Sequence, residues 1–129
     1  MNADGRRFEL NQITEIIIGC AFKVGNTLGC GFLEKVYENA LAHELRKAGL
    51  RVKQQYPMKV YYDGIVVGEF VVDLLVEECV MVELKAIRAM TEREDAQCIN
   101  HLKASGLTLC LLINFGNPKV EVKRKVRNF

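Results

Sequence analysis

The chain has 129 residues, of which 50% are hydrophobic and 26% charged, and its formal net charge is +2. These values are typical of one folded soluble domain, residues 1–129, that buries roughly two thirds of its unfolded surface. The longest apolar runs, such as "LTLCLLINF", are far shorter than the roughly 20 residues of a membrane helix, so we expect no membrane partner. The composition therefore excludes a disordered chain and a membrane-spanning chain.

The cysteines and the charge distribution indicate a cellular location and the kinds of ligand that the protein could bind. The five cysteines are scattered without a CxxC pair, and the N-terminus has no signal-peptide pattern, which predicts reduced thiols and a cytoplasmic location. Residues 61–84 carry six acids and no Lys or Arg, whereas residues 119–129 carry five bases and one acid. One region is therefore suited to a cation and another to phosphates, although a solvated turn and a basic tail for solubility would give the same pattern.

The first half of the chain has the periodicity of two helices. Apolar residues recur at helical spacing over residues 10–28, and "GCG" at 29–31 ends that segment. A second apolar stripe covers residues 32–48, with Gly49 as its stop signal. We expect a helical hairpin.

The second half has the signals of strands, with one helix between them. "MKVYY", an Asp63-Gly64 turn, "IVVGEFVVDLLV", a short acidic turn and "CVMVELKA" predict a three-stranded antiparallel meander. Thr91 and Glu94 have the spacing of a capping box that opens a helix ending near Ser105 and Gly106. "LTLCLLINF" then has the continuous apolar pattern of a strand buried on both faces, and residues 119–126 predict a last strand. The expected order is α-α-β-β-β-α-β-β, with one parallel strand pair across the third helix.

Charged residues interrupt the apolar strands at Asp73, Glu83 and Lys85. Side chains alternate along a strand, so Glu83 and Lys85 share one face. Asp73 lies opposite Glu83 only if the turn between them has an odd number of residues, because a slip of one residue inverts the facing. A two-residue turn at Glu77-Glu78 would put Asp73 on the wrong face. We therefore expect a three-residue loop or a bulge.

Two adjacent carboxylates repel each other unless a hard cation bridges them. Mg²⁺, or Mn²⁺, binds few carboxylates together with water or phosphate oxygens. Lys85, one step along the same face, would then hold or activate the attacking water, which is the equipment for hydrolysing a phosphodiester. The alternative from spacing alone is a plain ion pair between Asp73 and Lys85, and both interpretations stay open at this point.

A resemblance makes the pattern specific. Asp73, nine further residues and "ELK" at 83–85, after a helix that carries Glu34, resemble the PD-(D/E)XK nuclease superfamily. "GFLEKVY" at 31–37 is similar to the signature of the GxxExxY family within it, and "YENALAHEL", "DLLVE", "AQCINHLKASGL" and "LLINFG" continue the similarity along nearly the whole chain. The resemblance implies a restriction-endonuclease-like three-layer α/β/α fold with a mixed four- to five-stranded sheet.

The resemblance also implies roles. Asp73 and Glu83 would be metal ligands together with the Leu84 carbonyl, Lys85 would be the catalytic lysine, and Glu34 would be a further metal ligand or a water anchor. Gly31, Glu34 and Tyr37 recur every three residues and would lie along one band of the second helix. Gly31 would admit substrate or simply begin the helix. Tyr37 would contact substrate or lie in the core with its hydroxyl satisfied.

Gln97 and His101 lie four residues apart on the third helix and share a face. RecB-like exonucleases carry QxxxY there, and the resembled family usually has Tyr where this chain has His101. Gln97 is expected in the catalytic site, whereas His101 would either contact a phosphate or have a structural role. The chain also differs from the resembled family at two positions. Gly25 stands where that family commonly has a His, and Cys30 stands where it commonly has a Pro.

Two classes of function follow. The first is a Mg²⁺-dependent nuclease acting on DNA, with Lys123, Arg124 and Lys125 contacting phosphates and with a homodimer extending the DNA track. The second is a non-catalytic nucleic-acid-binding or assembly module that keeps the fold. The complete acidic and lysine set favours the nuclease, while the modest basic patch favours the module.

Overall fold

The computed structural model describes residues 8–127. Its helices and strands follow one another in the order α1 (Leu10–Leu28), α2 (Glu34–Lys47), β1 (Val52–Tyr62), β2 (Ile65–Val76), β3 (Val80–Lys85), α3 (Glu92–Ser105), β4 (Leu109–Asn114) and β5 (Glu121–Val126). This order is the one that the sequence predicts. No helix in this part of the chain has both the length and the apolar character that crossing a membrane requires.

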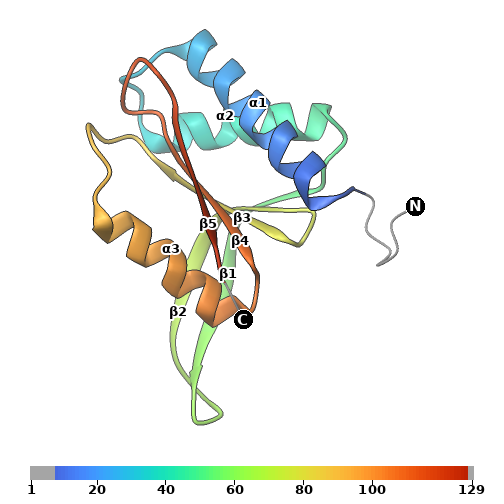
Figure 1. The fold of residues 1–129 in the computed structure, drawn as a ribbon, viewed down its shortest axis with the longest axis vertical. Coiled ribbons are helices and arrows are strands. Elements are labelled where there is room, and N and C mark those ends of the chain that lie inside the picture. Colours follow the sequence, from blue (N-terminus) through green and yellow to red (C-terminus); the bar gives the residue numbers. More distant parts are fainter. Residues whose placement is uncertain (1–7, 128–129) are drawn as a thin grey trace.

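The five strands form one mixed sheet in the order β1-β2-β3-β4-β5. β3 and β4 are parallel across the α3 connection, and the other neighbours are antiparallel. Helices α1 and α2 cover one face and α3 covers the other (Figure 1). The α/β three-layer fold expected from the sequence is therefore confirmed, with five strands in the sheet.

Alternating strand residues supply two separate cores. On the face covered by α1 and α2, β-strand residues such as Leu74, Val82 and Leu111 are fully buried. On the face covered by α3, Leu75, Met81 and Leu112 belong to a smaller core. β4 is buried along its whole length, as its continuous apolar sequence predicts. Asp73, Glu83 and Lys85 lie next to Leu74, Val82 and Leu84 of the larger core along their strands, so their side chains point to the α3 face.

The turn between β2 and β3 has the predicted odd length. Leu74 pairs with Val82 and Val76 with Val80, which leaves a three-residue loop at positions 77–79. Glu77 and Glu78 have φ angles of 50° and 57°, so the loop closes through left-handed backbone. With this register Asp73 and Glu83 occupy opposing positions on the same face. The three-residue loop expected from the facing of the two acids is confirmed.

The two helix boundaries with strong local signals are as expected, and one boundary differs. Thr91 and Glu94 form the capping box of α3, and Gly106 ends that helix at φ 77°. Helix α2 begins at Glu34, with Leu33 as its first flanking residue, instead of at Phe32. The expectation that Gly31 lies on this helix is therefore wrong. Gly31 belongs to the preceding loop, where its φ of 111° favours glycine.

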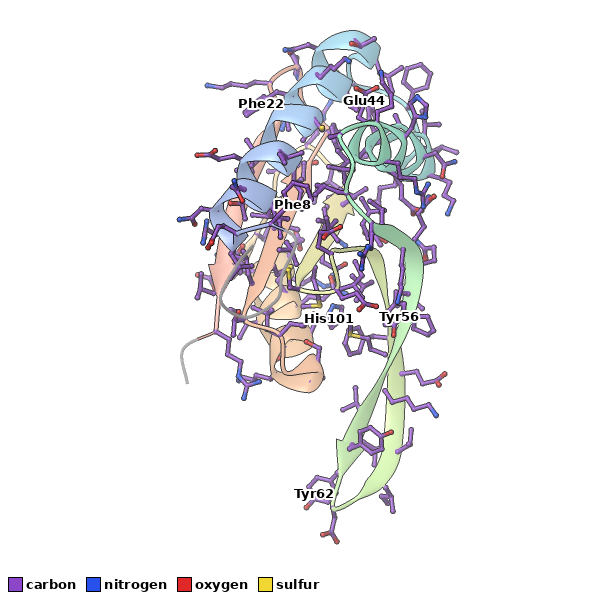
Figure 2. All side chains as sticks on the ribbon, turned by 90° about the vertical axis from the view of Figure 1, so that its right-hand side faces the viewer. Phe8, Phe22, Glu44, Tyr56, Tyr62 and His101 are labelled. Atoms are coloured by element: carbon purple, nitrogen blue, oxygen red, sulfur yellow. The ribbon has the colours of Figure 1, made fainter. Side chains whose placement is uncertain are left out.

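The β1–β2 hairpin is long and projects beyond the helices (Figures 1 and 2). Its tip is the predicted Asp63-Gly64 turn, with φ angles of 54° and 78°. The ladder is regular from Val52 to Tyr62 except for a shift next to Val60 and an interruption at Gln55. Gln55 is the one strand-interior residue of the described chain with a positive φ, 51°. In the β1–β2 register Gln55 stands opposite Asp73, so the interruption lies next to a candidate site residue.

Candidate active site

The carboxylate of Asp73 lies where β2 begins to separate from β3. The pairing of these strands ends at Leu74 and Val82. Beyond that point the Asp73 side chain replaces the backbone as the hydrogen-bond acceptor, because its Oδ2 accepts a hydrogen bond of 2.7 Å from the Leu84 backbone N–H. A strand amide that loses its ladder partner needs another acceptor, and Asp73 supplies one. The carboxylate is thereby fixed against the segment that carries Glu83 and Lys85.

Glu83 is 6% exposed and has a histidine as its partner. Its Oε1 lies 2.9 Å from Nδ1 of His101, which comes from α3. The His101 ring stacks on Phe70 of β2, with ring centroids 4.0 Å apart and planes 10° apart. The imidazole is thus held on two sides and orients one oxygen of Glu83. His101 lies beside Glu83, a predicted metal ligand, and also lines the cavity. It therefore has the structural role expected as one alternative and is also accessible from the cavity.

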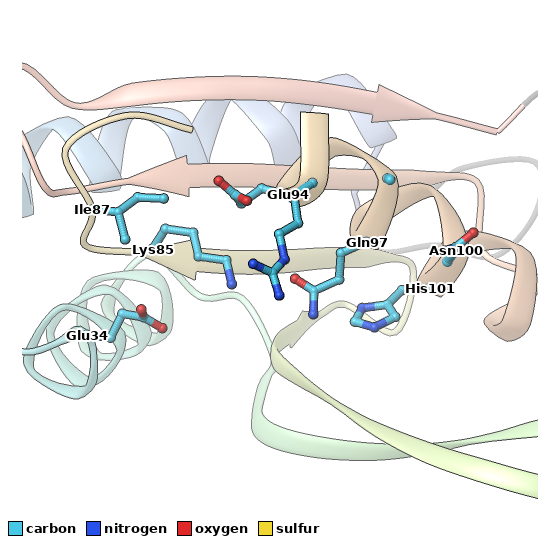
Figure 3. A pocket seen from close by; sticks show the side chains of 9 residues that line it. Glu34, Lys85, Ile87, Glu94, Gln97, Asn100 and His101 are labelled. Atoms are coloured by element: carbon cyan, nitrogen blue, oxygen red, sulfur yellow. The ribbon is translucent and has the colours of Figure 1, made fainter. Parts of the chain in front are cut away.

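Lys85 and Glu34 line the same cavity, which has a volume of about 640 Å³. Figure 3 shows Lys85 at the end of β3, Glu34 on α2, and Gln97 with His101 on α3 around the same space. The cavity is lined by Glu34, Lys85, Ile87, Arg93, Glu94, Ala96, Gln97, Asn100 and His101. The structure therefore brings together Glu34, Lys85 and Gln97 as the sequence predicts. Asp73 and Glu83 adjoin this cavity through Lys85 and His101 and do not line it.

All three carboxyl groups of the site have a raised pKa. Burial is the largest cause for Asp73, Glu83 and Glu34 alike. The charge of Asp73 raises the pKa of both glutamates further, while Lys85 and the hydrogen bonds to the carboxylates lower it. A shared positive charge would relieve both the burial penalty and the mutual repulsion. The electrostatics fit a cation-binding site.

The donor set fits a hard divalent ion that keeps several water molecules. Among residues 8–127, no three His, Cys, Asp or Glu side chains stand close enough to form a complete protein cage for a metal. Mg²⁺ is commonly bound through one or two carboxylates plus water and substrate oxygens. Asp73 and Glu83 can provide those two carboxylates. Leu84 contributes its N–H to Asp73, whereas its carbonyl as a ligand stays a prediction.

A polar network behind Asp73 was missed by the sequence analysis. Glu38 of α2 is only 3% exposed, and Gln55 donates to it over 2.6 Å. The same Gln55 amide lies 3.3 Å from Oδ1 of Asp73. Gln54 and Lys35 also donate to Glu38, at 2.7 and 3.0 Å. The sequence signal was available, since Glu38 lies one helical turn after Glu34 on the same helix.

Asn114 fixes the loop that follows Lys85. It is fully buried at the end of β4. Its Oδ1 accepts from the N–H groups of Ile87 and Gly116 at 3.0 Å each, and its Nδ2 donates to the Ile87 carbonyl at 2.8 Å. Gly116 packs directly against the Ile87 backbone, where a β-carbon would clash. The end of β3 is therefore clamped to the end of β4.

Two residues expected near substrate lie elsewhere. Tyr37 is fully buried and stacks on Phe115, with centroids 4.7 Å apart. Its hydroxyl donates to the Gly29 carbonyl at 2.6 Å and accepts from the Phe32 N–H at 3.2 Å. Tyr37 is thus a core residue with a satisfied hydroxyl, which is one of the two roles that the sequence left open, and it does not line the cavity. Gly31 does not line the cavity and instead shapes the loop before α2.

The basic strand lies on the other side of α3 from the cavity. Lys123 and Lys125 form ion pairs with Asp95 at 3.5 and 3.3 Å. Arg124 alternates with them and points to the opposite face of the sheet. The three bases do not form one continuous surface, and none lines the cavity. Phosphate contact by these residues stays a prediction.

The position where the resembled family commonly has a histidine is closed in this chain. Gly25 is packed against Val120 and Phe115, and a β-carbon at this position would clash with Val120. Cys30, where a proline is common, is exposed in the loop before α2. These differences concern the packing of α1 and the loop before α2, and Asp73, Glu83 and Lys85 are present.

Comparison with known proteins identifies the family. The family model described as the PD-(D/E)XK nuclease superfamily matches residues 11–125, and the chain belongs to this superfamily. No curated protein matches the chain. Among solved structures, the alkaline exonuclease LHK-Exo from Laribacter hongkongensis is similar, with a TM-score of 0.45 and 12% sequence identity over 89% of this chain and 82% of the exonuclease. PD-(D/E)XK nucleases generally use divalent metal ions, in agreement with the donor set described above.

Proposed function

We propose that this protein is a Mg²⁺-dependent nuclease that hydrolyses DNA phosphodiester bonds, with Mn²⁺ as an alternative ion. The observation that carries the proposal is the pair of carboxylates on adjacent strands, the partly buried Asp73 and the buried Glu83, with Lys85 on the same face. Membership of the nuclease superfamily supports a nucleic-acid substrate. The stretch "GFLEKVY" supports placement in the GxxExxY family.

Each residue has a distinct role in the proposed site. Asp73, Glu83 and the Leu84 carbonyl would hold the ion, and Glu34 would bind it directly or through water. The ion would supply positive charge at the phosphate and lower the pKa of a bound water. The Lys85 ammonium would donate to the attacking water or to a phosphate oxygen as negative charge develops. Gln97, from the same cavity wall, would orient the phosphate through its amide.

The decisive experiment separates metal binding from cleavage. Mn²⁺ affinity is measured by calorimetric titration, and cleavage is measured on linear, circular and single-stranded DNA and on RNA, with Mg²⁺, with Mn²⁺ and with chelator. Asp73→Asn should weaken metal binding and cleavage together. Lys85→Ala should abolish cleavage while metal affinity stays the same or increases, because protonated lysine has no lone pair for the ion. Lys103→Ala, at an exposed lysine of α3, is the matched control.

Other outcomes would refute the assignments. If folded Lys85→Ala lost metal affinity as strongly as Asp73→Asn, the roles would be wrong. Cleavage of RNA but not of DNA would show that the proposed substrate, DNA, is wrong. Cleavage that persists in chelator would show that the reaction does not depend on a metal ion.

The second candidate function is a non-catalytic nucleic-acid-binding or assembly module. It is favoured by the pairing of Lys123 and Lys125 with Asp95, because these are two of the three bases expected to contact phosphates. Wild-type protein that binds DNA but leaves it intact with either ion would put this candidate first. Neutralising Lys123, Arg124 and Lys125 should flatten the salt dependence of DNA binding if these residues contact phosphates.

Location and assembly complete the proposal. We propose a cytoplasmic protein, which the free thiols of all five cysteines support. We also keep the homodimer as a prediction. Sedimentation at several protein concentrations, with and without DNA, measures the mass of the species and tests the dimer directly.

A further inference from the structure

Gln55 has a backbone conformation that is unusual for its place in the fold. It lies inside β1, yet its φ of 51° is in the left-handed region, which is unfavourable for residues with a β-carbon. Its neighbours are regularly paired, Gln54 with Leu74 and Tyr56 with Val72, while Gln55 and the facing Asp73 are left out of the ladder. Such strain persists only where surrounding interactions impose it, and it gathers at functional sites.

The side chain of Gln55 accounts for the strain. Its Nε2 lies between two carboxylates, 2.6 Å from Oε1 of Glu38 and 3.3 Å from Oδ1 of Asp73. Glu38 is itself buried and receives further hydrogen bonds from Gln54 and Lys35. The Gln55 amide therefore has a rigid anchor on α2 and donates toward Asp73 on β2. Both oxygens of Asp73 are engaged, Oδ1 by Gln55 and Oδ2 by the Leu84 N–H.

We infer that Gln55 is a positioning residue for Asp73, with Glu38 as its anchor. The inference rests on the proposed function, because Asp73 needs a fixed orientation only if it binds the metal ion. A carboxylate held at both oxygens by neutral donors loses its rotational freedom. Outer residues that orient ligands in this way typically contribute 10–100-fold to metal affinity.

A purely structural role for Gln55 is the competing explanation. In that case the amide serves only to satisfy the buried Glu38, and its removal lowers stability without a specific effect on metal binding. The positive φ separates the two explanations. Glycine adopts this conformation without strain, so Gln55→Gly removes the amide while it relieves the backbone.

The test uses the full chain and Mn²⁺ as the probe, without DNA. Gln55→Gly should bind Mn²⁺ about 10–100-fold more weakly than wild type, while its urea midpoint falls little or rises. Asp63→Gly is the matched control, because Asp63 has a similar φ of 54° at the distant hairpin tip. It should leave Mn²⁺ affinity unchanged. If Gln55→Gly does not fold, Gln55→Asn replaces it, because asparagine tolerates the left-handed region and is too short to bridge both carboxylates.

A double-variant cycle tests the anchor. Glu38→Gln should weaken Mn²⁺ binding in wild type and have no further effect in Gln55→Gly, since Glu38 acts through Gln55. Independent, multiplicative losses would overturn the anchor. Gln55→Gly with wild-type Mn²⁺ affinity would overturn the positioning role and leave the proposed function intact. Wild type that binds no Mn²⁺ at all would overturn both.

Discussion

Replacement of the Asn114 amide should strongly destabilise the protein. Asn114→Leu is close in volume and keeps the fully buried position filled. It removes three hydrogen bonds, two accepted from the N–H groups of Ile87 and Gly116 and one donated to the Ile87 carbonyl. Leaving a buried backbone group unsatisfied costs about 1–3 kcal/mol. Because solvent can reach some of these groups after local opening, we expect a loss of about 3–5 kcal/mol, a large part of the roughly 5–15 kcal/mol that stabilises a typical domain.

Urea unfolding of wild type and variant measures this loss. The midpoint should fall while the slope stays the same, which identifies a change in stability without a change in the surface exposed. Asn117→Ala is the matched control, because Asn117 is only partly buried and makes a single hydrogen bond of 2.7 Å, to the Arg88 carbonyl in the loop after β3. It should cost about 1 kcal/mol or less. A loss below about 1.5 kcal/mol for Asn114→Leu would show that the clamp contributes little and would refute the argument.

Three further variants test the environment of the site. Tyr37→Phe should lower the free energy of unfolding by about 1–2 kcal/mol and leave Mn²⁺ affinity unchanged, because the hydroxyl bonds only to backbone; altered DNA binding in the folded variant would restore a substrate role. His101→Phe keeps an aromatic ring against Phe70 but frees Glu83, so Mn²⁺ affinity should fall in calorimetric titration, and unchanged affinity would exclude an orienting role. Glu83→Gln should stabilise the protein when chelator is present. Burial is the main cause of the raised pKa of Glu83, so wild type loses stability as the pH rises above the ordinary pKa of a glutamate. The advantage of the variant in urea midpoint should therefore grow between about pH 4 and pH 7, and equal midpoints throughout would contradict the burial penalty.

Much of the fold was predictable because local signals agree with one another along the chain. Hydrophobic periodicity predicted α1 with the bounds that the structure gives, Leu10–Leu28. The Asp63-Gly64 turn and the capping box at Thr91 have local chemistry that specifies their conformations. The three-residue turn at 77–79 was predictable for a different reason. Two acids separated along a hairpin could share a face only with an odd turn, so chemistry constrained the register.

The unpredicted features depend on contacts between distant segments. Nothing local favours a left-handed residue at Gln55, and the conformation has a reason only once Glu38 and Asp73 are placed on either side. Asn114 is a polar residue at the end of an apolar run, and its partners lie 27 positions earlier at Ile87 and two positions later at Gly116. For Tyr37 the sequence left two roles open, because the repeat of three residues suggested a band with Glu34 while an apolar stripe suggested the core. The hydrogen bonds of its hydroxyl to Gly29 and Phe32 decide for the core.

The hydrogen bond between the Leu84 N–H and Asp73 serves the fold and also orients a candidate metal ligand. Where β2 leaves β3, the Leu84 N–H needs an acceptor, and Asp73 Oδ2 provides it at 2.7 Å. A neutral asparagine could accept the same bond, so folding alone does not require the charge. Burial raises the pKa of Asp73, which shows that the charged form is disfavoured there without a counter-ion. The negative charge therefore costs stability at a position where a neutral group would satisfy the backbone, and the proposed cation would make the charge advantageous.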